Sequence, residues 1–325
     1  MLKEPPNSRV LFIGLNYHEY TSAIINEIEN QFQYEVDYID IQPRAIFFKV
    51  IKTLSPKIYK IYLNLHHKFS IKKHKGKKYK YILFLQCHQI SDQNLSKLRS
   101  SFKNSKFILY NWDSVETHNY LDKVNFFNKI ATFDPKDAKA NRFQYLPLFC
   151  KRDIQEFSVS TDEKKSIFMI GNIVNPKRLE EVNKFDRICK KNNIIFKKYL
   201  KISPVVMVKC LSKKLNISNL KFIDANKKKI KQLYENSSVV FDYANHKQSG
   251  LTMRACEALG SGKQLVTNCK TLQGSKYEKS GQVYVYENFV DENFLKSFLK
   301  NGFDCSIKNT EFNIQNFIKK LFEEL

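Results

Sequence analysis

Short apolar runs rich in β-branched and aromatic residues alternate along the chain with stretches of helical periodicity, and this alternation limits the fold more than any other feature. The clearest runs are RVLFIGL at 9–15, YKYILFL at 79–85, SIFMI at 166–170 and SVVFD at 238–242. Strands that are buried on both faces of a parallel sheet read in this way, and they need helical crossovers between them. The sequence therefore predicts an α/β fold built from βα units.

The expected elements fall into two sets, separated by a polar segment at 151–165 where we place the domain junction. The first set has a helix at 20–31 and strands at 9–15, 34–39, 79–85, 106–110, 129–133 and 144–148. The second set has strands at 166–170, 194–199, 220–223, 238–242 and 263–267, and helices at 178–192, 227–236 and 251–259. Each set predicts one Rossmann-like domain.

These domains are expected at 1–155 and at 156–309. They would face each other across a cleft lined by the carboxyl ends of both sheets, which is where open α/β sheets bind ligands. Residues 310–325 have the pattern of an amphipathic helix that can pack back on the first domain.

The 325-residue chain has a net charge of +23, which favours a polyanionic partner. No Asp or Glu occurs from 41 to 91, and cations alternate with apolar residues over the segment 44–80 at roughly helical spacing. A basic helix with an apolar face is typical of elements that bind an anionic membrane surface. Helices that simply cover the first sheet are the alternative. Nucleic acid is not expected as a partner, because the cations crowd into one segment without a recognisable reading motif.

Other features of the sequence argue against several classes of protein. Neither a secretory signal nor a run of membrane-spanning length is apparent, so we expect a cytoplasmic protein. The seven cysteines form no C-x-x-C pair, which argues against a zinc site and a disulfide framework. No apolar-flanked D-x-D and no G-x-G-x-x-G after the first strand is present. We therefore expect no metal and no cofactor.

The stretch QSGLTMRACEALGSGKQLVTN at 248–268 carries the strongest chemical signal. Gly250 lies between a strand and a helix, so the backbone can approach a ligand where the positive end of the helix dipole binds phosphate. Glu257 follows two turns later, at a distance that suits a carboxylate bound to ribose hydroxyls. The alternative is a surface ion pair between Arg254 and Glu257 at i, i+3, worth a few tenths of a kcal/mol.

This stretch resembles the donor-binding motif G-L-x-x-x-E-A-x-x-x-G of GT-B glycosyltransferases, and most of all that of bacterial lipopolysaccharide and capsular polysaccharide enzymes. The strings YNWDS, TFDPKDA and YLPLF in the first half are similar to the same group. The resemblance implies that the domain at 1–155 binds the acceptor and the domain at 156–309 binds the nucleotide-sugar donor. It also implies that Gly250, Leu251 and Thr252 contact the donor phosphates and that Glu257 contacts the ribose. Ser249 and Gly250 stand where the common retaining families have a second glutamate, so that chemistry is not implied.

Cations near the departing phosphate would accelerate sugar transfer without a metal. Arg178 follows the loop that begins at Gly171 and Asn172 after a strand, and it is placed like a phosphate-clamping arginine. Lys247 and Arg254 are further candidates for the donor site. The alternative for each cation is an ordinary solvated side chain.

An inverting enzyme would also need a general base for the acceptor hydroxyl. Asp113 in YNWDS follows a strand of the first half, and His18 and Glu19 follow another. Asp113 could instead begin the next helix. Asp134 and Asp137 are interpreted as a loop and helix start, although they could shape the acceptor side.

Together these features predict a metal-independent glycosyltransferase that transfers a sugar from a nucleotide-sugar donor to a lipopolysaccharide, capsule or other surface glycan. The lipid-linked acceptor would lie at the inner face of a bacterial cytoplasmic membrane, with the enzyme bound peripherally. A non-catalytic nucleic-acid-binding protein and a degenerate glycosyltransferase-like scaffold are the alternatives.

Overall fold

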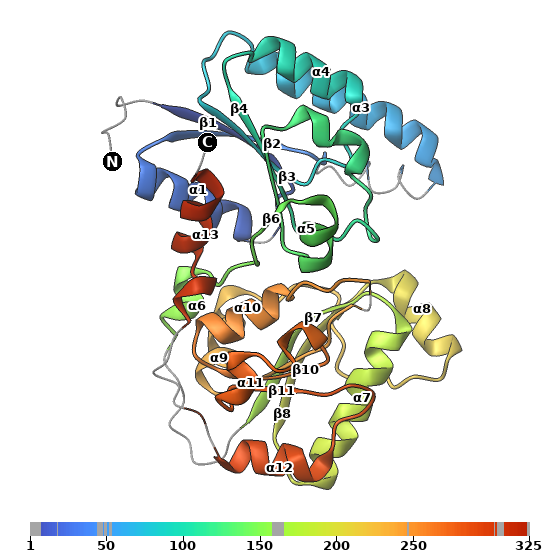
Figure 1. Ribbon diagram of the computed structural model, residues 1–325. Helices are drawn as coiled ribbons and strands as arrows, with labels where there is room; N and C mark the ends of the chain where they lie inside the picture. The colour runs from blue at the N-terminus through green and yellow to red at the C-terminus, as the bar shows by residue number, and fades with distance from the viewer. Residues whose placement is uncertain are drawn as a thin grey trace. The chain divides into compact units, whose positions relative to one another are not determined.

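The computed structural model describes residues 8–17, 19–43, 48, 51, 54–157, 166–245, 247–301, 303 and 309–323. The chain divides into two compact units, which are residues 1–147 with 314–325 (unit 1) and residues 148–313 (unit 2) (Figure 1). Each unit is an α/β layer structure around one parallel sheet, so the predicted fold class of two Rossmann-like domains is confirmed.

Unit 1 contains a six-stranded sheet in the order β2-β1-β3-β4-β5-β6. Its strands are β1 (Arg9–Gly14), β2 (Glu35–Asp40), β3 (Tyr81–Leu85), β4 (Lys106–Asn111), β5 (Lys129–Thr132) and β6 (Gln144–Tyr145). Its helices are α1 (Tyr20–Phe32), α3 (Pro56–Lys73), α4 (Asp92–Ser101), η1 (Leu121–Phe126), α5 (Pro135–Asn141) and α13 (Ile314–Phe322). All neighbouring strands are parallel, as the crossover pattern predicts.

Alternate residues of the central strands face opposite helical layers. Leu11 and Phe84 share one core with Ile71 of α3 and Leu95 of α4. The other face of the sheet meets the C-terminal helix, because the ring of Tyr110 packs on Phe317 of α13 with centroids 4.8 Å apart. Both faces are covered, which is why the strands read as continuous apolar runs.

Helix α13 belongs to unit 1 although unit 2 separates it from the rest of that unit in sequence. It lies beside α1 (Figure 1), with Phe322 against Phe32 at 5.5 Å and against Tyr81 at 5.1 Å between centroids. The amide of Gln31 also donates to the carbonyl of Gln315 at 3.0 Å. The amphipathic pattern at the end of the chain is thus satisfied by the apolar surface of unit 1.

Unit 2 contains a five-stranded sheet in the order β11-β10-β9-β7-β8. Its strands are β7 (Ile167–Ile173), β8 (Phe196–Ile202), β9 (Val239–Asp242), β10 (Gln264–Thr267) and β11 (Val283–Val285). Its helices are α6 (Arg152–Gln155), α7 (Pro176–Lys191), α8 (Pro204–Ser212), α9 (Lys227–Glu235), α10 (Met253–Gly260), η2 (Lys270–Leu272), α11 (Lys276–Lys279), α12 (Glu292–Asn301) and η3 (Thr310–Phe312).

Helices α7 and α12 pack on the sheet of unit 2 through buried apolar side chains. Phe185 of α7 stacks on Phe241 of β9 with centroids 3.9 Å apart, and Leu295 of α12 joins the same cluster. On the opposite face, Phe168 of β7 packs on Tyr234 of α9 at 4.8 Å.

Two expected elements differ from the structure. The segment 220–223 forms only a single bridge, between Lys221 and Lys201 of the edge strand β8, because its apolar side chains Phe222 and Ile223 remain exposed instead of packing in the core. The boundary between the units falls at 147/148, before the polar segment, because the backbone amide of Cys150 bonds the carbonyl of Phe312 in unit 2.

Candidate active site

The strand order of unit 2 reverses next to β7. The chain passes from β7 to β8 on one side and later returns to β9 on the other side, so β7 and β9 flank the point of reversal. These two strands pair only at Ile167–Val239 and Phe168–Val240, whereas β7 continues along β8 to Ile173. They therefore part toward their carboxyl ends, which is where open α/β sheets bind ligands.

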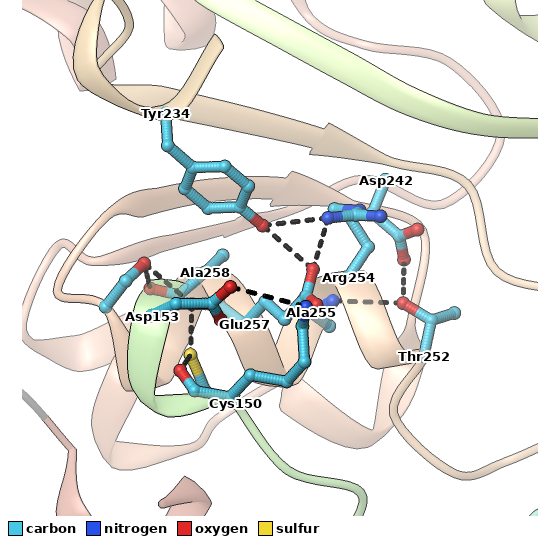
Figure 2. Close-up of polar contacts among 11 residues, drawn as sticks. Cys150, Asp153, Tyr234, Asp242, Thr252, Arg254, Ala255, Glu257 and Ala258 are labelled. Atoms are coloured by element: carbon cyan, nitrogen blue, oxygen red, sulfur yellow. Dashed lines mark hydrogen bonds and ion pairs between the residues drawn. The ribbon is translucent and has the colours of Figure 1, made fainter. Parts of the chain in front are cut away.

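Helix α10 begins beside this opening. Thr252 is its N-cap, and the Thr252 hydroxyl accepts the amide of Ala255 at 3.0 Å. The same hydroxyl donates to Oδ2 of Asp242, at the end of β9, over 2.8 Å (Figure 2). The helix starts at Met253 and not at 251, so Ser249, Gly250 and Leu251 form the approach to it. The cap thus ties the positive end of the helix dipole to the end of β9.

Arg178 reaches the same place from α7. Asn175 caps that helix by accepting the Arg178 amide at 2.9 Å, and Pro176 stands at the first helical position, where its missing amide costs nothing. Nη2 of Arg178 lies 3.5 Å from the position that a Cβ at Gly171 would occupy. The glycine thus leaves the guanidinium room against the end of β7. Nε of Arg178 is buried and has no hydrogen-bond partner among the described atoms.

Asp242 is the anionic centre of this arrangement, and the sequence patterns did not single it out. Its side chain is buried, and burial raises the pKa of its carboxyl, while Arg178, the Thr252 hydroxyl and Arg254 act in the opposite direction. The available signal was its place at the end of the SVVFD strand, next to the motif that follows. The structure therefore gathers Gly171, Arg178, Thr252 and Arg254 around one buried carboxylate.

Glu257 is buried inside unit 2 and does not lie on the exposed side of α10. It is 0% exposed, and its Oε2 accepts the hydroxyl of Tyr234 at 2.9 Å and the guanidinium of Arg254 (Figure 2). Tyr234 also accepts from Nη1 of Arg254 at 2.9 Å. The ion pair between Arg254 and Glu257 thus exists, but Glu257 is buried and both residues also bond Tyr234, so it is not a surface pair. Contact between Glu257 and a ribose stays a prediction.

The other donor-side candidates lie close to this region in sequence. Asn172 is half-buried and pairs with Lys201 in the β7–β8 ladder. Lys247 is exposed in the loop before α10, and the carbonyl of Ser249 accepts a hydrogen bond from Thr271. The roles of Lys247, Ser249 and Asn172 at a donor stay predictions.

In unit 1, Asp113 follows β4 at the carboxyl edge of the sheet. Its Oδ2 accepts a hydrogen bond from the side-chain amide of Gln86, and Nε2 of His118 lies 4.0 Å away. Residues 114–118 form a turn, so Asp113 does not begin a helix there. Asp134 does cap α5, as the simpler interpretation expected, by accepting the amides of Lys136 and Asp137. His18 lies outside the described residues.

Among the described residues, no group of three or more His, Cys, Asp or Glu side chains is placed to hold a metal ion. None of the described helices is long and apolar enough to cross a lipid bilayer.

Comparison with known proteins defines the fold. No protein-family model matches the chain, and no curated protein matches it in sequence. Solved structures do match over nearly the whole chain. The avilamycin A biosynthesis glycosyltransferase AviGT4 is 9% identical, with 97% of this chain and 96% of AviGT4 covered and a TM-score of 0.59.

Two further structures match at similar levels. The lipopolysaccharide outer core galactosyltransferase WaaB is 12% identical, with 98% and 96% of the two chains covered and a TM-score of 0.52. A Listeria monocytogenes protein provisionally assigned as a UDP-N-acetylglucosamine 2-epimerase is 9% identical, with 97% and 95% covered and a TM-score of 0.52. The chain has the GT-B fold.

The GT-B fold alone does not choose a reaction, because the matching structures include both sugar transferases and an epimerase. Function has to be argued from the site. In this GT-B chain the candidate reactive groups lie around Asp242 in unit 2 and around Asp113 in unit 1.

Proposed function

We propose that this protein is a metal-independent glycosyltransferase that uses a nucleotide-sugar donor. The observation that carries the proposal is that Arg178 acts electrostatically on Asp242, which accepts a hydrogen bond from the N-cap of α10 where β7 and β9 part. A diphosphate fits this chemistry, because a helix N-terminus and an arginine both favour negative charge. The GT-B fold shared with AviGT4 and WaaB supports the same reaction class.

The proposed reaction breaks the bond between the sugar anomeric carbon and the diphosphate oxygen and forms a bond to an acceptor hydroxyl oxygen. Negative charge grows on the departing nucleoside diphosphate as that bond breaks. Arg178 and the positive end of α10 would stabilise this charge, and Asp242 would keep the arginine oriented before the donor arrives. No step in this scheme requires a metal ion.

Calorimetry with UDP, GDP, dTDP, ADP and CMP tests the donor site. One of these nucleotides should bind, and Arg178→Ala should weaken that binding roughly 10- to 150-fold, the loss of a charged hydrogen bond. The neighbouring Lys177 is exposed, and Lys177→Ala is the matched control. Absence of binding by all five nucleotides would refute the donor proposal.

A transfer assay then separates the remaining functions. A glycosyltransferase releases nucleotide only as the sugar appears on an acceptor. An epimerase would change the donor sugar without any acceptor, and a degenerate scaffold would bind nucleotide without releasing sugar. A nucleic-acid-binding protein would bind RNA or DNA in a salt-sensitive way and ignore the nucleotides.

For the acceptor we propose a lipid-linked glycan of lipopolysaccharide or capsule type at the inner face of a bacterial cytoplasmic membrane. Helix α3 supports this, because it has apolar residues on two faces. Leu63, His67 and Ile71 are buried against unit 1. A second stripe is exposed and consists of Leu54, just before the helix, and Ile58, Ile61, Tyr62, Leu65 and Phe69.

The exposed stripe lies among cations. Lys57, Lys60, Lys68 and Lys72 are all exposed on the same helix, and the helix carries no acidic residue. Apolar side chains that enter the headgroup region, with lysines beside anionic lipid, are the features of an interfacial helix. Localisation at the membrane surface rests on this helix.

A further inference from the structure

The connection between β9 and α10 runs over residues 243–252 and leads to the helix start that is proposed to face a donor diphosphate. Strands β9 and β10 pair in parallel register as far as Asp242 and Thr267. The ladder ends after this pair, so the path of the connection depends on other contacts to its backbone. Side chains at and just after the end of β10 supply such contacts.

Asn268, the residue directly after β10, bonds both backbone groups of Ala244. Its Oδ1 accepts the amide of Ala244 at 2.6 Å, and its Nδ2 donates to the carbonyl of Ala244 at 3.3 Å. A carboxamide offers a donor and an acceptor as a peptide group does, so it can continue the pairing of a ladder whose backbone has ended. Asn268 is half-buried and Ala244 is buried, so breaking these bonds would leave polar groups poorly solvated.

The later part of the connection is bonded from η2. The hydroxyl of Thr271 donates to the carbonyl of Ser249. The hydroxyl of Thr267 also bonds the carboxyl of Asp242, which accepts from the N-cap Thr252 as well. Side chains of β10 and η2 therefore hold the connection near both of its ends, and they reach the same carboxyl group as the start of α10.

The composition of the connection suits an anion. Residues 243–252 contain no Asp or Glu, and Lys247 is exposed among them. Backbone amides at the start of a helix bind a phosphate only when they point toward it together. A loop that already has its binding conformation binds more tightly, because less conformational entropy is lost when the ligand arrives. The bonds from Asn268 and Thr271 provide this order in the unliganded protein.

We propose that Asn268 is a positioning residue of the donor site, whose carboxamide, together with the Thr271 hydroxyl, holds residues 244–252 in the conformation that receives a diphosphate. The inference rests on the proposed transferase function, because the diphosphate is that of the donor. Both side chains act through the backbone that they bond and not on the reacting atoms. Without them the connection samples other conformations, and only a fraction of the molecules is ready to bind.

The first test needs no ligand. Asn268→Leu keeps a side chain of similar size and removes both hydrogen bonds to Ala244. Hydrogen exchange read by mass spectrometry should become about 10-fold faster in peptides that span 243–252, with peptides of β7 and β8 unchanged, because exchange reports local stability. Thr271→Val should accelerate exchange in the same peptides. Thr271→Ser keeps the hydroxyl and should restore the wild-type rate.

Asn309→Leu is the matched control, because Asn309 bonds the other end of α10 through the same kind of side chain. Its Nδ2 donates to the carbonyl of Leu259 at 3.1 Å and to Oε1 of Gln282 at 2.9 Å. This variant should lower the stability toward urea and leave exchange in 243–252 unchanged. If those peptides exchange at the wild-type rate in folded Asn268→Leu, the carboxamide does not hold the connection and the inference is overturned.

The second test measures the affinity for whichever of UDP, GDP, dTDP, ADP and CMP wild type binds most tightly. Asn268→Leu should weaken binding about 10- to 30-fold, since each of two lost hydrogen bonds contributes about fivefold, and Asn309→Leu should stay within about twofold. In the transfer assay the donor KM of Asn268→Leu should rise by the same factor while kcat stays within about threefold, because the bound connection regains its conformation.

A merely structural role for Asn268 would lower the stability of the protein and leave this affinity and KM unchanged. Wild-type affinity in folded Asn268→Leu would therefore overturn the inference and leave the transferase proposal intact. Failure of wild type to bind any of the five nucleotides would overturn the transferase proposal, and the donor role of Asn268 with it, whatever the exchange rates are.

Discussion

Glu257 and Asp242 are two carboxylates that the fold of unit 2 removes from water, and each has a different set of partners. Glu257 meets a guanidinium and a phenol within a closed triad. Asp242 meets a helix-cap hydroxyl where two strands part. The first arrangement fixes α10 against α9, and the second fixes the groups proposed to face a phosphate. These roles predict different consequences of substitution.

Glu257→Ala should lower the free energy of unfolding by about 3–5 kcal/mol, because Arg254 would keep its charge in a partly buried site without its carboxylate. Tyr234→Phe should cost less, about 2 kcal/mol, because the hydroxyl loses its hydrogen bonds to Glu257 and from Arg254 while the ion pair between those two residues remains. Urea denaturation measures both. Glu287→Ala, at an exposed glutamate of the same unit, is the control. A stable Glu257→Ala protein that binds nucleotide poorly would assign the carboxylate to the ribose instead.

Asp242→Asn tests how the buried carboxyl group changes the stability of the protein with pH. Folding raises the pKa of Asp242 above its ordinary value of 3.8. At a pH between the ordinary pKa and the raised pKa, the folded protein therefore holds a proton that the unfolded chain has released. Wild type should therefore gain stability relative to Asp242→Asn as the pH falls through this window, by at most about 1.4 kcal/mol per pH unit.

Denaturation midpoints at successive pH values between 4 and 7 provide that comparison. Glu180→Gln, at an exposed position of α7, should run parallel to wild type. A wild type that loses stability relative to Asp242→Asn on acidification would mean that the carboxyl pKa is lowered and that its cations outweigh burial.

The sequence predicted Arg178, Gly171 and Thr252 because each stands at a strand end or helix start, which are local features. It did not predict Asp242, because an aspartate that ends a strand looks the same whether it is buried or exposed. The hydroxyl that bonds Asp242 belongs to the N-cap Thr252, whereas the sequence predicts a helix that already starts at 251. The left-handed conformation of Gln86 has no local signature either, since glutamine carries no turn preference.

Among the elements, α3 shows what periodicity can and cannot specify. Its basic, apolar character predicted a helix, and α3 forms over Pro56–Lys73. Apolar residues occur around most of its circumference, however, so the pattern could not tell which stripe packs on the sheet. The segment 220–223 did not become a strand for a related reason. Its apolar run does not show which residues pack in the core, and Phe222 and Ile223 stay exposed beside the edge strand β8.

Helix α3 should carry the membrane affinity of the protein. Replacing Lys60 and Lys68 together by Gln should lower partitioning to anionic phosphatidylglycerol vesicles about 25-fold, since each lysine contributes about 1 kcal/mol near such a surface. Ile61→Ser should also weaken binding, by removing an exposed apolar side chain from the stripe. Vesicle co-sedimentation measures both effects.

Lys139→Gln on α5 is the control, because Lys139 is exposed in the same unit but lies on another element. Uncharged phosphatidylcholine vesicles should bind all variants weakly. Equal losses from the α3 and α5 substitutions would mean that net charge alone drives binding and that α3 has no special part.

At the scale of the whole molecule, the chain leaves unit 1, forms unit 2 and returns to complete unit 1 with α13. The sequence predicted an amphipathic helix near the end, but its packing partner depends on tertiary structure. That partner is an aromatic surface formed by Phe32, Tyr34, Tyr81 and Tyr110. The last helix therefore belongs to the stability of unit 1, although unit 2 precedes it directly in sequence.

Phe317→Ala tests this assignment, because Phe317 is 2% exposed and packs on Tyr110 of β4. Loss of a buried phenylalanine should cost about 3–5 kcal/mol, and the cost should fall on unit 1 alone. Hydrogen exchange read by mass spectrometry should then show faster exchange in peptides of β1 and β4, with β7 and β9 unchanged, because exchange reports stability locally. Phe294→Ala, at an exposed phenylalanine of α12, should alter neither set. Faster exchange in β7 and β9 after Phe317→Ala would show that α13 stabilises unit 2 as well, and the division of the chain into these two units would not describe its energetics.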